Sequence, residues 1–463
     1  MKIPQYKINI FLLFVIFLEL VYACDNFTEV ELPSSQLTAR AVFETKETAN
    51  AAMIDIYSKI RENGLLTGKS TGTGSQFGLY TDELTYYGQS GTGQANFYNN
   101  SILASDSEIS EWWNSSYSQI YAANAVLEGV ALSKTLEAID KQQLTGEALF
   151  VRALIHFYLV NTFGPIPYIS TTDYRANGSV KRMPETQVYE NLKNDLQKAI
   201  DFLPPAYNGS NRIRPNKGAA QALLARVCLY LRQWQEASNA ASAVLNQTDL
   251  YVWPSSIDSL FEKESLSTIW QLMPATDGTN TYEGNVFNFS QVPPPVMAIS
   301  TTLYSNFSSN DLRKTHWIKS ITDGTNIWYR AYKYKLATNT STSMEYSIVL
   351  RMAEQYLIRA EARAQAGDLI GAKEDLNKTR NLAGLQNTTA ISAPQIIDAV
   401  LKERQLEFFT EFGHRFFDLK RAGLLDNTLT PQKLQWKSSN QFLPLPESEL
   451  LLNPNLSPQN EGY

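Results

Sequence analysis

The residues of this chain that are best suited to bind a ligand are aromatic and amide side chains in two polar stretches. The first stretch contains Asp82, Tyr86, Tyr87, Asn96, Phe97 and Tyr98, and the second contains Tyr282, Trp317 and Trp328. A sugar ring has apolar C–H faces, which aromatic rings cover, and hydroxyl groups, which Asn, Asp and Gln hydrogen-bond. The composition therefore predicts a carbohydrate-binding site. Packing beneath a long loop is the alternative for any single aromatic residue, whereas several members of the group are expected to face solvent.

Catalytic and metal-binding chemistry is not indicated. The three histidines, His156, His316 and His414, are isolated in the sequence, and His156 lies among apolar residues as a packed histidine does. Glycoside hydrolysis needs two carboxylates about 5 to 9.5 Å apart across a cleft. Asp82 and Glu83 are adjacent and have no identifiable companion acid. We therefore expect no catalytic residue, no metal and no cofactor.

The glycine-containing stretch 64–70, GLLTGKS, does not qualify as a phosphate-binding loop. It has three residues between its glycines where the P-loop has four, and it follows a predicted helix instead of a strand. The formal net charge is −6 and the pI is about 5.4, without a basic patch. This charge balance argues against a nucleic-acid partner.

The N-terminus has the features of an export signal. Lys2 and Lys7 precede an apolar run over 8–21, and small Ala23 is followed by Cys24. A basic start, a short apolar stretch and a small residue at the cut are typical of a secretory signal peptide. The Ala-Cys junction resembles a bacterial lipobox, which predicts a lipoprotein signal over 1–23 and acylation of Cys24. An ordinary signal peptide with an incidental cysteine is the alternative.

The rest of the chain, 24–463, is predicted to form one mostly α-helical body. Helices are expected over 44–61, 106–132, 135–163 and 185–203. Two helical hairpins follow, 217–231 with 234–245 and 347–366 with 369–382. Aligning the two hairpins places Ala225 on Ala360, Leu229 on Ala364 and Ala237 on Ala372, so small residues occupy most of the matching offsets. This is a weak tetratricopeptide pattern.

Two long insertions interrupt the helices, at about 65–105 and 248–346. Both are polar and rich in aromatic residues, and we expect them to be irregular, except for a possible strand over 328–336. The predicted fold is thus mostly α, a scaffold of tetratricopeptide-like hairpins that carries a long irregular aromatic-rich subdomain.

A single helix is predicted over 397–421, and the scaffold is expected to pack around it. Its apolar residues recur at helical spacing, and Glu403, Glu407 and Glu411 form one row four residues apart. We interpret it as a core helix whose ion pairs anchor its neighbours.

Several blocks together resemble the SusD/RagB-type outer-membrane glycan-binding lipoproteins of Bacteroidota. The matching blocks are Ala23-Cys24, TDEL (81–84), EWWNSSYSQIYAANAVLEGV (111–130), GEALFVRALIHFYLVNTFGPIPYI (146–169), RPNKGAAQALLARVCLYL (214–231), YLIRAEARAQAG (356–367), ERQLEFFTEFGHRFFDLKR (403–421), FLPLPESEL (442–450) and NPNLSPQNEGY (453–463). They follow the family order over nearly the whole chain.

The resemblance implies a lipid-anchored protein on the surface of the outer membrane. Such a protein captures oligosaccharides without cleaving them and passes them to a SusC/RagA-like TonB-dependent transporter. The family has no shared catalytic residue, and its ligand contacts vary between members. The alternative hypothesis is a helical-repeat lid or adaptor that binds peptide or protein, which burial of the insertion aromatics would favour.

Overall fold

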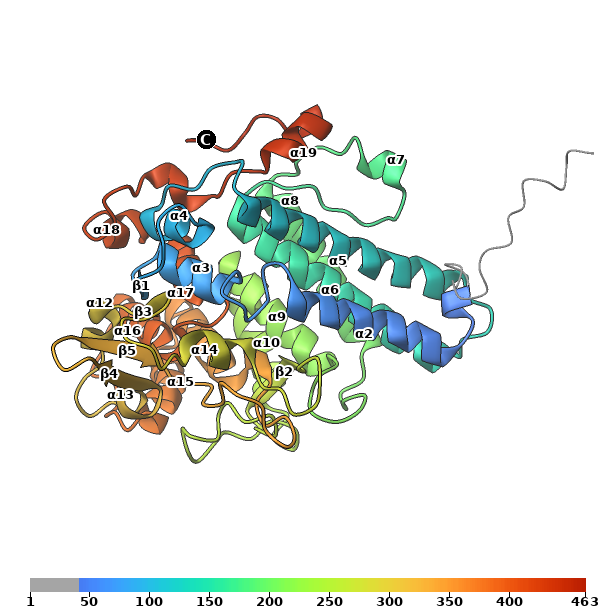
Figure 1. The fold of residues 1–463 in the computed structure, drawn as a ribbon. Helices are drawn as coiled ribbons and strands as arrows, with labels where there is room; N and C mark the ends of the chain where they lie inside the picture. The colour runs from blue at the N-terminus through green and yellow to red at the C-terminus, as the bar shows by residue number, and fades with distance from the viewer. Residues whose placement is uncertain (1–40) are drawn as a thin grey trace, which may run out of the picture.

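Long antiparallel helices form one side of the molecule, and a small sheet with short helices forms the other (Figure 1). The computed structural model describes residues 41–463, so the predicted signal peptide and Cys24 lie outside the described residues. The prediction of a mostly α fold with tetratricopeptide-like hairpins is confirmed.

The first helical layer surrounds one nearly apolar helix, α6. Its members are η1 (Ala41–Phe43), α2 (Lys46–Glu62), α5 (Ser107–Leu132), α6 (Ala138–Phe163), α7 (Tyr174–Asn177) and α8 (Glu185–Phe202). From Leu144 to its end, α6 is buried on almost every face, because α5 and α8 pack along it. A helix that is apolar all round is stable only when it is covered in this way.

The two hairpins follow the predicted pairing closely. They consist of α9 (Lys217–Tyr230) with α10 (Trp234–Leu245) and of α14 (Met352–Gln365) with α15 (Leu369–Leu382). Ala225 and Ala237 of the first hairpin and Ala360 and Ala372 of the second are fully buried. Side chains this small let the antiparallel helices approach closely, as the sequence predicted.

The start of the second hairpin differs from the prediction. Residues Ser347–Arg351 form strand β6 instead of helix, and they pair antiparallel with β2 (Thr268–Leu272) in a two-stranded sheet. The segment contains β-branched Ile348 and Val349, and a partner strand about 75 residues earlier in the chain is available to it. Tertiary pairing therefore overrides local helix periodicity here.

The prediction of one continuous helix over 397–421 is also wrong. It is two helices, α16 (Ala393–Phe408) and α17 (His414–Arg421), separated by a turn. Thr410, Phe412 and Gly413 have positive φ in that turn. A Cβ at Gly413 would lie 2.8 Å from the Phe77 ring, so the close approach of that ring requires glycine.

The glutamate row, Glu403 and Glu407 on α16 and Glu411 in the turn after it, does anchor neighbouring elements by buried ion pairs, as predicted, but its partners come from distant segments. Arg313 lies 2.7 Å from Glu403 and 3.0 Å from Glu407. Arg351 lies 2.6 Å from Glu407 and 2.9 Å from Glu411. Buried pairs of this kind are costly to break, since each leaves an uncompensated charge.

The two insertions are more regular than expected, and they share one sheet. The sheet has the order β1 (Leu84–Tyr86), β3 (Met297–Ile299), β5 (Ile327–Ala331) and β4 (Ile318–Thr322), all antiparallel. The short helices of the insertions are α3 (Thr73–Tyr80), α4 (Gly93–Asn99), α11 (Tyr282–Phe287), α12 (Thr301–Asn306) and α13 (Leu312–His316). The strand expected over 328–336 is thus confirmed in its first part.

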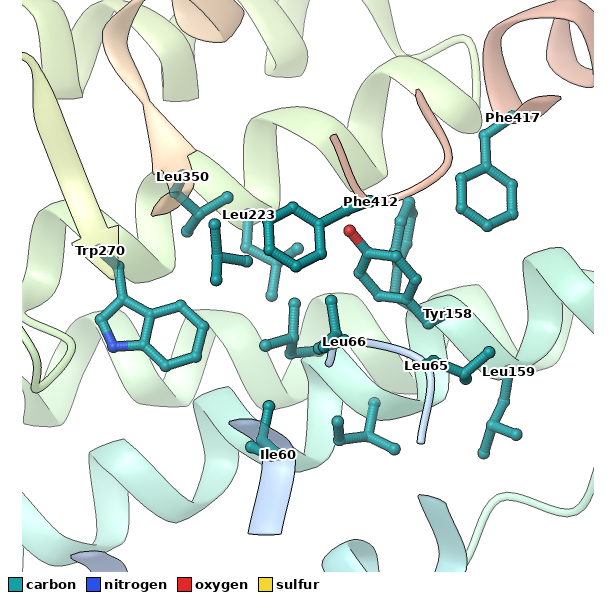
Figure 2. Close-up of a cluster of buried hydrophobic side chains, with 14 of the residues drawn as sticks. Ile60, Leu65, Leu66, Tyr158, Leu159, Leu223, Trp270, Leu350, Phe412 and Phe417 are labelled. Atoms are coloured by element: carbon teal, nitrogen blue, oxygen red, sulfur yellow. The ribbon is translucent and has the colours of Figure 1, made fainter. Parts of the chain in front are cut away.

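The C-terminal segment consists of α18 (Leu425–Leu429), η2 (Ser438–Gln441), α19 (Glu447–Leu452) and η3 (Pro454–Leu456). The core joins residues that are far apart in the sequence. Figure 2 shows the Phe412 ring between Leu223 and Tyr158, with Ile60 in the same cluster.

Candidate functional site

Three tyrosines gather at the edge strand β1, and we call Tyr86, Tyr87 and Tyr98 the tyrosine patch. Tyr86 ends β1, Tyr87 follows it, and Tyr98 lies on α4. The rings of Tyr86 and Tyr98 have centroids 6.2 Å apart and are tilted by 35°. Tyr87 is 41% exposed, and the other two are half-buried. The patch therefore presents aromatic surface to solvent on a fixed scaffold.

A polar loop holds the Tyr86 ring in place. The Tyr86 hydroxyl donates to the Gln89 carbonyl at 2.8 Å, and it lies 2.7 Å from the Thr92 hydroxyl. A Cβ at Gly88 would lie 2.5 Å from that hydroxyl, so the ring folds back over a position without a side chain. Gln89 and Ser90 are exposed beside the ring and offer polar groups to a ligand.

Tyr87 joins the two insertions. Its backbone N–H donates to the Val296 carbonyl at 2.7 Å, which extends the β1–β3 pairing by one residue. Burial raises the pKa of the Tyr87 hydroxyl, Tyr98 raises it further, and the Trp328 side chain lowers it through a hydrogen bond. The two stretches chosen from the sequence thus meet at this residue.

Two of the predicted aromatic residues belong to the core and not to a binding surface. Phe97 and Trp317 are each 1% exposed. Phe97 packs edge-on against Phe77, and Trp317 packs edge-on against Phe261. A ring covered on both faces has no face left for a sugar, so we remove both residues from the candidate site.

Trp328 is intermediate between these cases. It is 9% exposed and packs with Phe289 and Ala298 on the sheet. The hydrogen bond between the Trp328 and Tyr87 side chains connects this buried residue to the tyrosine patch.

The predicted polar residues also have structural partners. The Asp82 carboxylate is buried and accepts two hydrogen bonds from Arg415, at 2.8 and 2.7 Å. The Asn96 side-chain amide donates to Asp106 at 3.1 Å, where α5 begins. Both residues therefore fix the loops that carry the patch.

Tyr282 lies at a different place. Its hydroxyl donates to Glu62 at 2.7 Å, and the Lys69 ammonium lies 4.9 Å from its ring centroid. It lines a small cavity of about 110 Å³ together with Arg61 and Glu283. This cavity shares no lining residue with the tyrosine patch, so the structure does not join Tyr282 to the other candidates.

Glu83 is the carboxyl group nearest the patch in sequence. Burial raises its pKa to about 8, and the neighbouring Asp82 charge contributes to the rise. A perturbed carboxyl group is a feature of many active sites. Glu83 is nevertheless only 2% exposed and accepts a hydrogen bond from the Thr410 N–H at 3.4 Å. No substrate reaches it, and its role is structural.

His156 is unavailable as a metal ligand. His156 is buried, its Nδ1 lies 2.8 Å from the Arg152 carbonyl, and its ring stacks on Tyr168. Burial lowers its pKa to about 3. Within residues 41–463, no group of three or more His, Cys, Asp or Glu side chains is arranged to hold a metal ion.

One residue next to the patch was not found from the sequence. The Lys433 ammonium lies 4.0 Å from the Tyr98 ring centroid and donates to the carbonyls of Leu79 and Tyr98. Burial lowers its pKa to about 8. Lys433 covers the inner face of Tyr98 and leaves the other side of the patch to a ligand. Nothing in its local sequence, 430–436, signals this contact.

Two family models match most of the chain. The model described as "Starch-binding associating with outer membrane" matches residues 34–229, and the model described as "SusD family" matches residues 275–463. The chain belongs to the SusD/RagB family. The first description names starch binding and not catalysis, which agrees with the expectation that the protein is not an enzyme.

Relatives of known name support the same assignment. SusD-like protein P2 of Formosa agariphila is 26% identical, over 99% of this chain and all of that relative. The starch-binding protein SusD of Bacteroides thetaiotaomicron is 32% identical, over 32% of this chain and 28% of that protein.

Solved structures of SusD-like proteins share the fold. A laminarin-binding SusD-like protein superposes with a TM-score of 0.75 at 24% identity, over 90% of this chain and 99% of that one. Surface glycan-binding protein A from Bacteroides thetaiotaomicron gives the same TM-score at 18% identity, over 90% and 99% of the two chains. Across residues 41–463, no helix combines the length and apolar character needed to cross a membrane.

Proposed function

We propose that the protein captures oligosaccharides on the cell surface through the tyrosine patch. The observation that carries this proposal is the exposed Tyr87, which stands where β1 of one insertion meets β3 of the other. Tyr86 and Tyr98 lie beside it, and the carbonyl and amide groups of the 88–94 loop border it. Aromatic rings next to polar groups suit the apolar faces and hydroxyl groups of a sugar.

The arrangement of the patch favours capture over chemistry. The loops that carry it are held by buried polar contacts, such as Asp82 with Arg415 and Asn96 with Asp106. A surface that is already ordered binds without the cost of ordering its side chains. The carboxyl groups nearest the patch in sequence, Asp82 and Glu83, are buried and engaged.

Family membership supports the remaining parts of the proposal. We propose that Cys24 is acylated after removal of residues 1–23 and that the acyl chains hold the protein on the outer membrane, facing the medium. A SusC-like TonB-dependent transporter would then receive the captured oligosaccharide. The family description "associating with outer membrane" supports this location. Replacement of Cys24 by Ala should abolish metabolic labelling with palmitate and release the protein from membranes.

A helical-repeat adaptor that binds peptide is the second candidate. It is favoured by the burial of Phe97 and Trp317 and by a hollow of about 320 Å³ between the hairpins, which Arg232, Trp234 and Glu361 line. A peptide presents backbone amides and charged side chains, which such a hollow suits better than an aromatic patch does.

The test is a calorimetric titration of the mature chain without its acylated cysteine, from Asp25 onward, with a polysaccharide panel that includes starch and laminarin. Saturable binding without release of new reducing ends supports capture without cleavage. If the folded protein binds no polysaccharide but binds a peptide library, and the replacement of Trp234 by Ala removes that binding, the adaptor is the correct assignment.

A further inference from the structure

A second aromatic surface lies on α5, well away from the sheet that carries the tyrosine patch (Figure 1). Trp113, Tyr117 and Tyr121 follow one another at intervals of four residues, so they lie on the same face of the helix. The Trp113 and Tyr117 rings have centroids 4.8 Å apart. Exposure increases along the row, from buried Trp113 to Tyr121, which is 51% exposed. We call the row of Trp113, Tyr117 and Tyr121 the aromatic platform.

The platform forms the floor of a groove with a volume of about 450 Å³. One wall is the segment 167–180, whose helix α7 carries Tyr174, and the other wall is the C-terminal segment 449–456. Tyr174 is 73% exposed, and Arg175 holds its ring from one side, with the guanidinium 5.7 Å from the ring centroid and a hydrogen bond of 3.2 Å to the hydroxyl. Cavities of about 300 to 1,000 Å³ are typical of small-molecule sites.

Side chains of α5 fasten the first wall. Glu128 accepts a hydrogen bond from the Thr172 N–H at 2.8 Å and from the Thr171 and Thr172 hydroxyls. These hydrogen bonds lower the pKa of Glu128. The Asn124 amide donates to the Ile169 carbonyl at 3.1 Å. The wall is therefore held in position before any ligand arrives.

The second wall is fastened to the first. The Asn453 amide donates to the Val180 carbonyl at 2.8 Å, and the Asn455 amide donates to the Ser179 carbonyl at 3.0 Å. Three segments far apart in the sequence thus enclose one groove of fixed width. Such preorganisation favours a specific ligand, because little conformational entropy is lost on binding.

From this geometry we propose that the groove is a second carbohydrate site, for a neutral oligosaccharide of a few rings. Tyr117, Tyr121 and Tyr174 supply ring faces for the apolar side of the sugars. Asn114 and Glu449 line the same groove and supply groups for hydroxyls. Glu449 is the one charged side chain among the described lining residues, and its carboxylate repels an anionic sugar; Arg175, which donates to the Tyr174 hydroxyl at 3.2 Å, lies beside the groove and does not line it.

The dimensions decide between a sugar and a protein partner. A specific protein interface buries about 800 Å² on each partner, whereas this groove is a narrow hollow between three segments. Beyond Tyr121 it continues into a second hollow of about 590 Å³ that Phe43 and Leu132 line. A linear chain of sugars fits a groove that continues in one direction better than a single compact ligand does.

The groove goes beyond the function proposed above, since it shares no residue with the tyrosine patch. The two sites can be observed separately by fluorine NMR on the mature chain labelled with 3-fluorotyrosine. The resonances of Tyr87, Tyr121 and Tyr174 are assigned by replacing each residue in turn by Phe. The probes are four neutral trisaccharides: maltotriose, laminaritriose, cellotriose and mannotriose.

The expected result is a saturable shift of the Tyr121 and Tyr174 resonances with at least one trisaccharide. Tyr174→Ala should weaken the Tyr121 titration by at least tenfold, while Tyr87→Ala and the control Ile370→Ala, an exposed residue on α15, leave it unchanged. Failure of all four sugars to shift either resonance overturns the site, as does a Tyr121 shift that Tyr87→Ala removes. A response of Tyr121 without one of Tyr87 leaves the groove standing and contradicts the function proposed for the patch.

Discussion

Two ends of one short segment, 82–87, have opposite environments. At the first end, Asp82 and Glu83 are buried, and Asp82 is paired with Arg415. Three to four residues later, Tyr86 and Tyr87 reach the surface, and Tyr87 is the more exposed of the two. The strand β1 connects the two environments within a few residues. The buried end fixes the position of the strand, and the exposed end is thereby presented in a defined orientation, so the charged pair and the aromatic patch have separate roles.

The largest expected effect is at the buried end. Asp82→Ala leaves the Arg415 guanidinium mostly buried without its partner, and we expect a loss of about 3 to 5 kcal/mol in the free energy of unfolding. Urea denaturation of the mature chain measures this loss. The control is Lys59→Ala, which removes an exposed ion pair with Asp55 and should leave the midpoint almost unchanged. A loss below about 1 kcal/mol for Asp82→Ala would show that the pair does not fix the strand.

A core aromatic residue in the same insertion should be equally intolerant of truncation. Phe97 is fully buried on α4, one residue before Tyr98 of the patch. Phe97→Ala removes its contacts with Phe77 and Trp112, and we expect a loss of about 3 to 5 kcal/mol in the free energy of unfolding. Thermal or urea unfolding decides the point, with Tyr87→Ala as the matched control, which should stay within about 0.5 kcal/mol of the wild type. Equal losses in the two variants would contradict the distinction between the core and the patch.

Of the two ends of the 82–87 segment, the buried end should contribute to the pH dependence of stability. The folded-state pKa of Glu83 is raised from 4.5 to about 8, first by burial and then by the Asp82 charge. The folded chain therefore binds this proton more tightly than the unfolded chain does. The contribution of Glu83 to stability is fully present below about pH 4.5 and is lost as the pH rises through about 8.

Glu83→Gln keeps the shape of the side chain and cannot ionise. The decline in the free energy of unfolding between pH 5 and 8 should be smaller in this variant, which urea titrations at several pH values will measure. Tyr87→Phe, at the exposed end, should leave the wild-type slope unchanged. An identical slope in the wild type and Glu83→Gln would mean that the carboxyl group of Glu83 ionises normally in the folded chain.

The sequence predicts those elements whose structure follows from local spacing. Helices with strong local periodicity, such as 234–245 and 369–382, have the predicted bounds, because their apolar faces follow from the spacing alone. The strand at 347–351 and the turn at Gly413 were missed, since a distant strand and the Phe77 ring determine them. These are tertiary contacts that no local pattern contains.

The exposure of the candidate site residues also depends on tertiary contacts. Phe97 and Tyr98 are adjacent aromatic residues in a polar stretch, yet one is in the core and the other is in the patch. Helix α4 turns successive side chains in different directions, and only its packing against α3 determines which face is covered. The row of Trp113, Tyr117 and Tyr121 could have been found from its spacing, but it lies in a helix that the sequence analysis assigned to the scaffold.

The most direct test of the account is the affinity of Tyr87→Ala for the polysaccharide that the wild type binds, measured by calorimetry on folded mature protein. We predict that the replacement weakens binding to the patch by roughly tenfold, equivalent to about 1.4 kcal/mol, while the unfolding midpoint stays at the wild-type value. Unchanged affinity in a folded Tyr87→Ala protein would contradict the claim that the exposed end of β1 is where this protein binds its glycan.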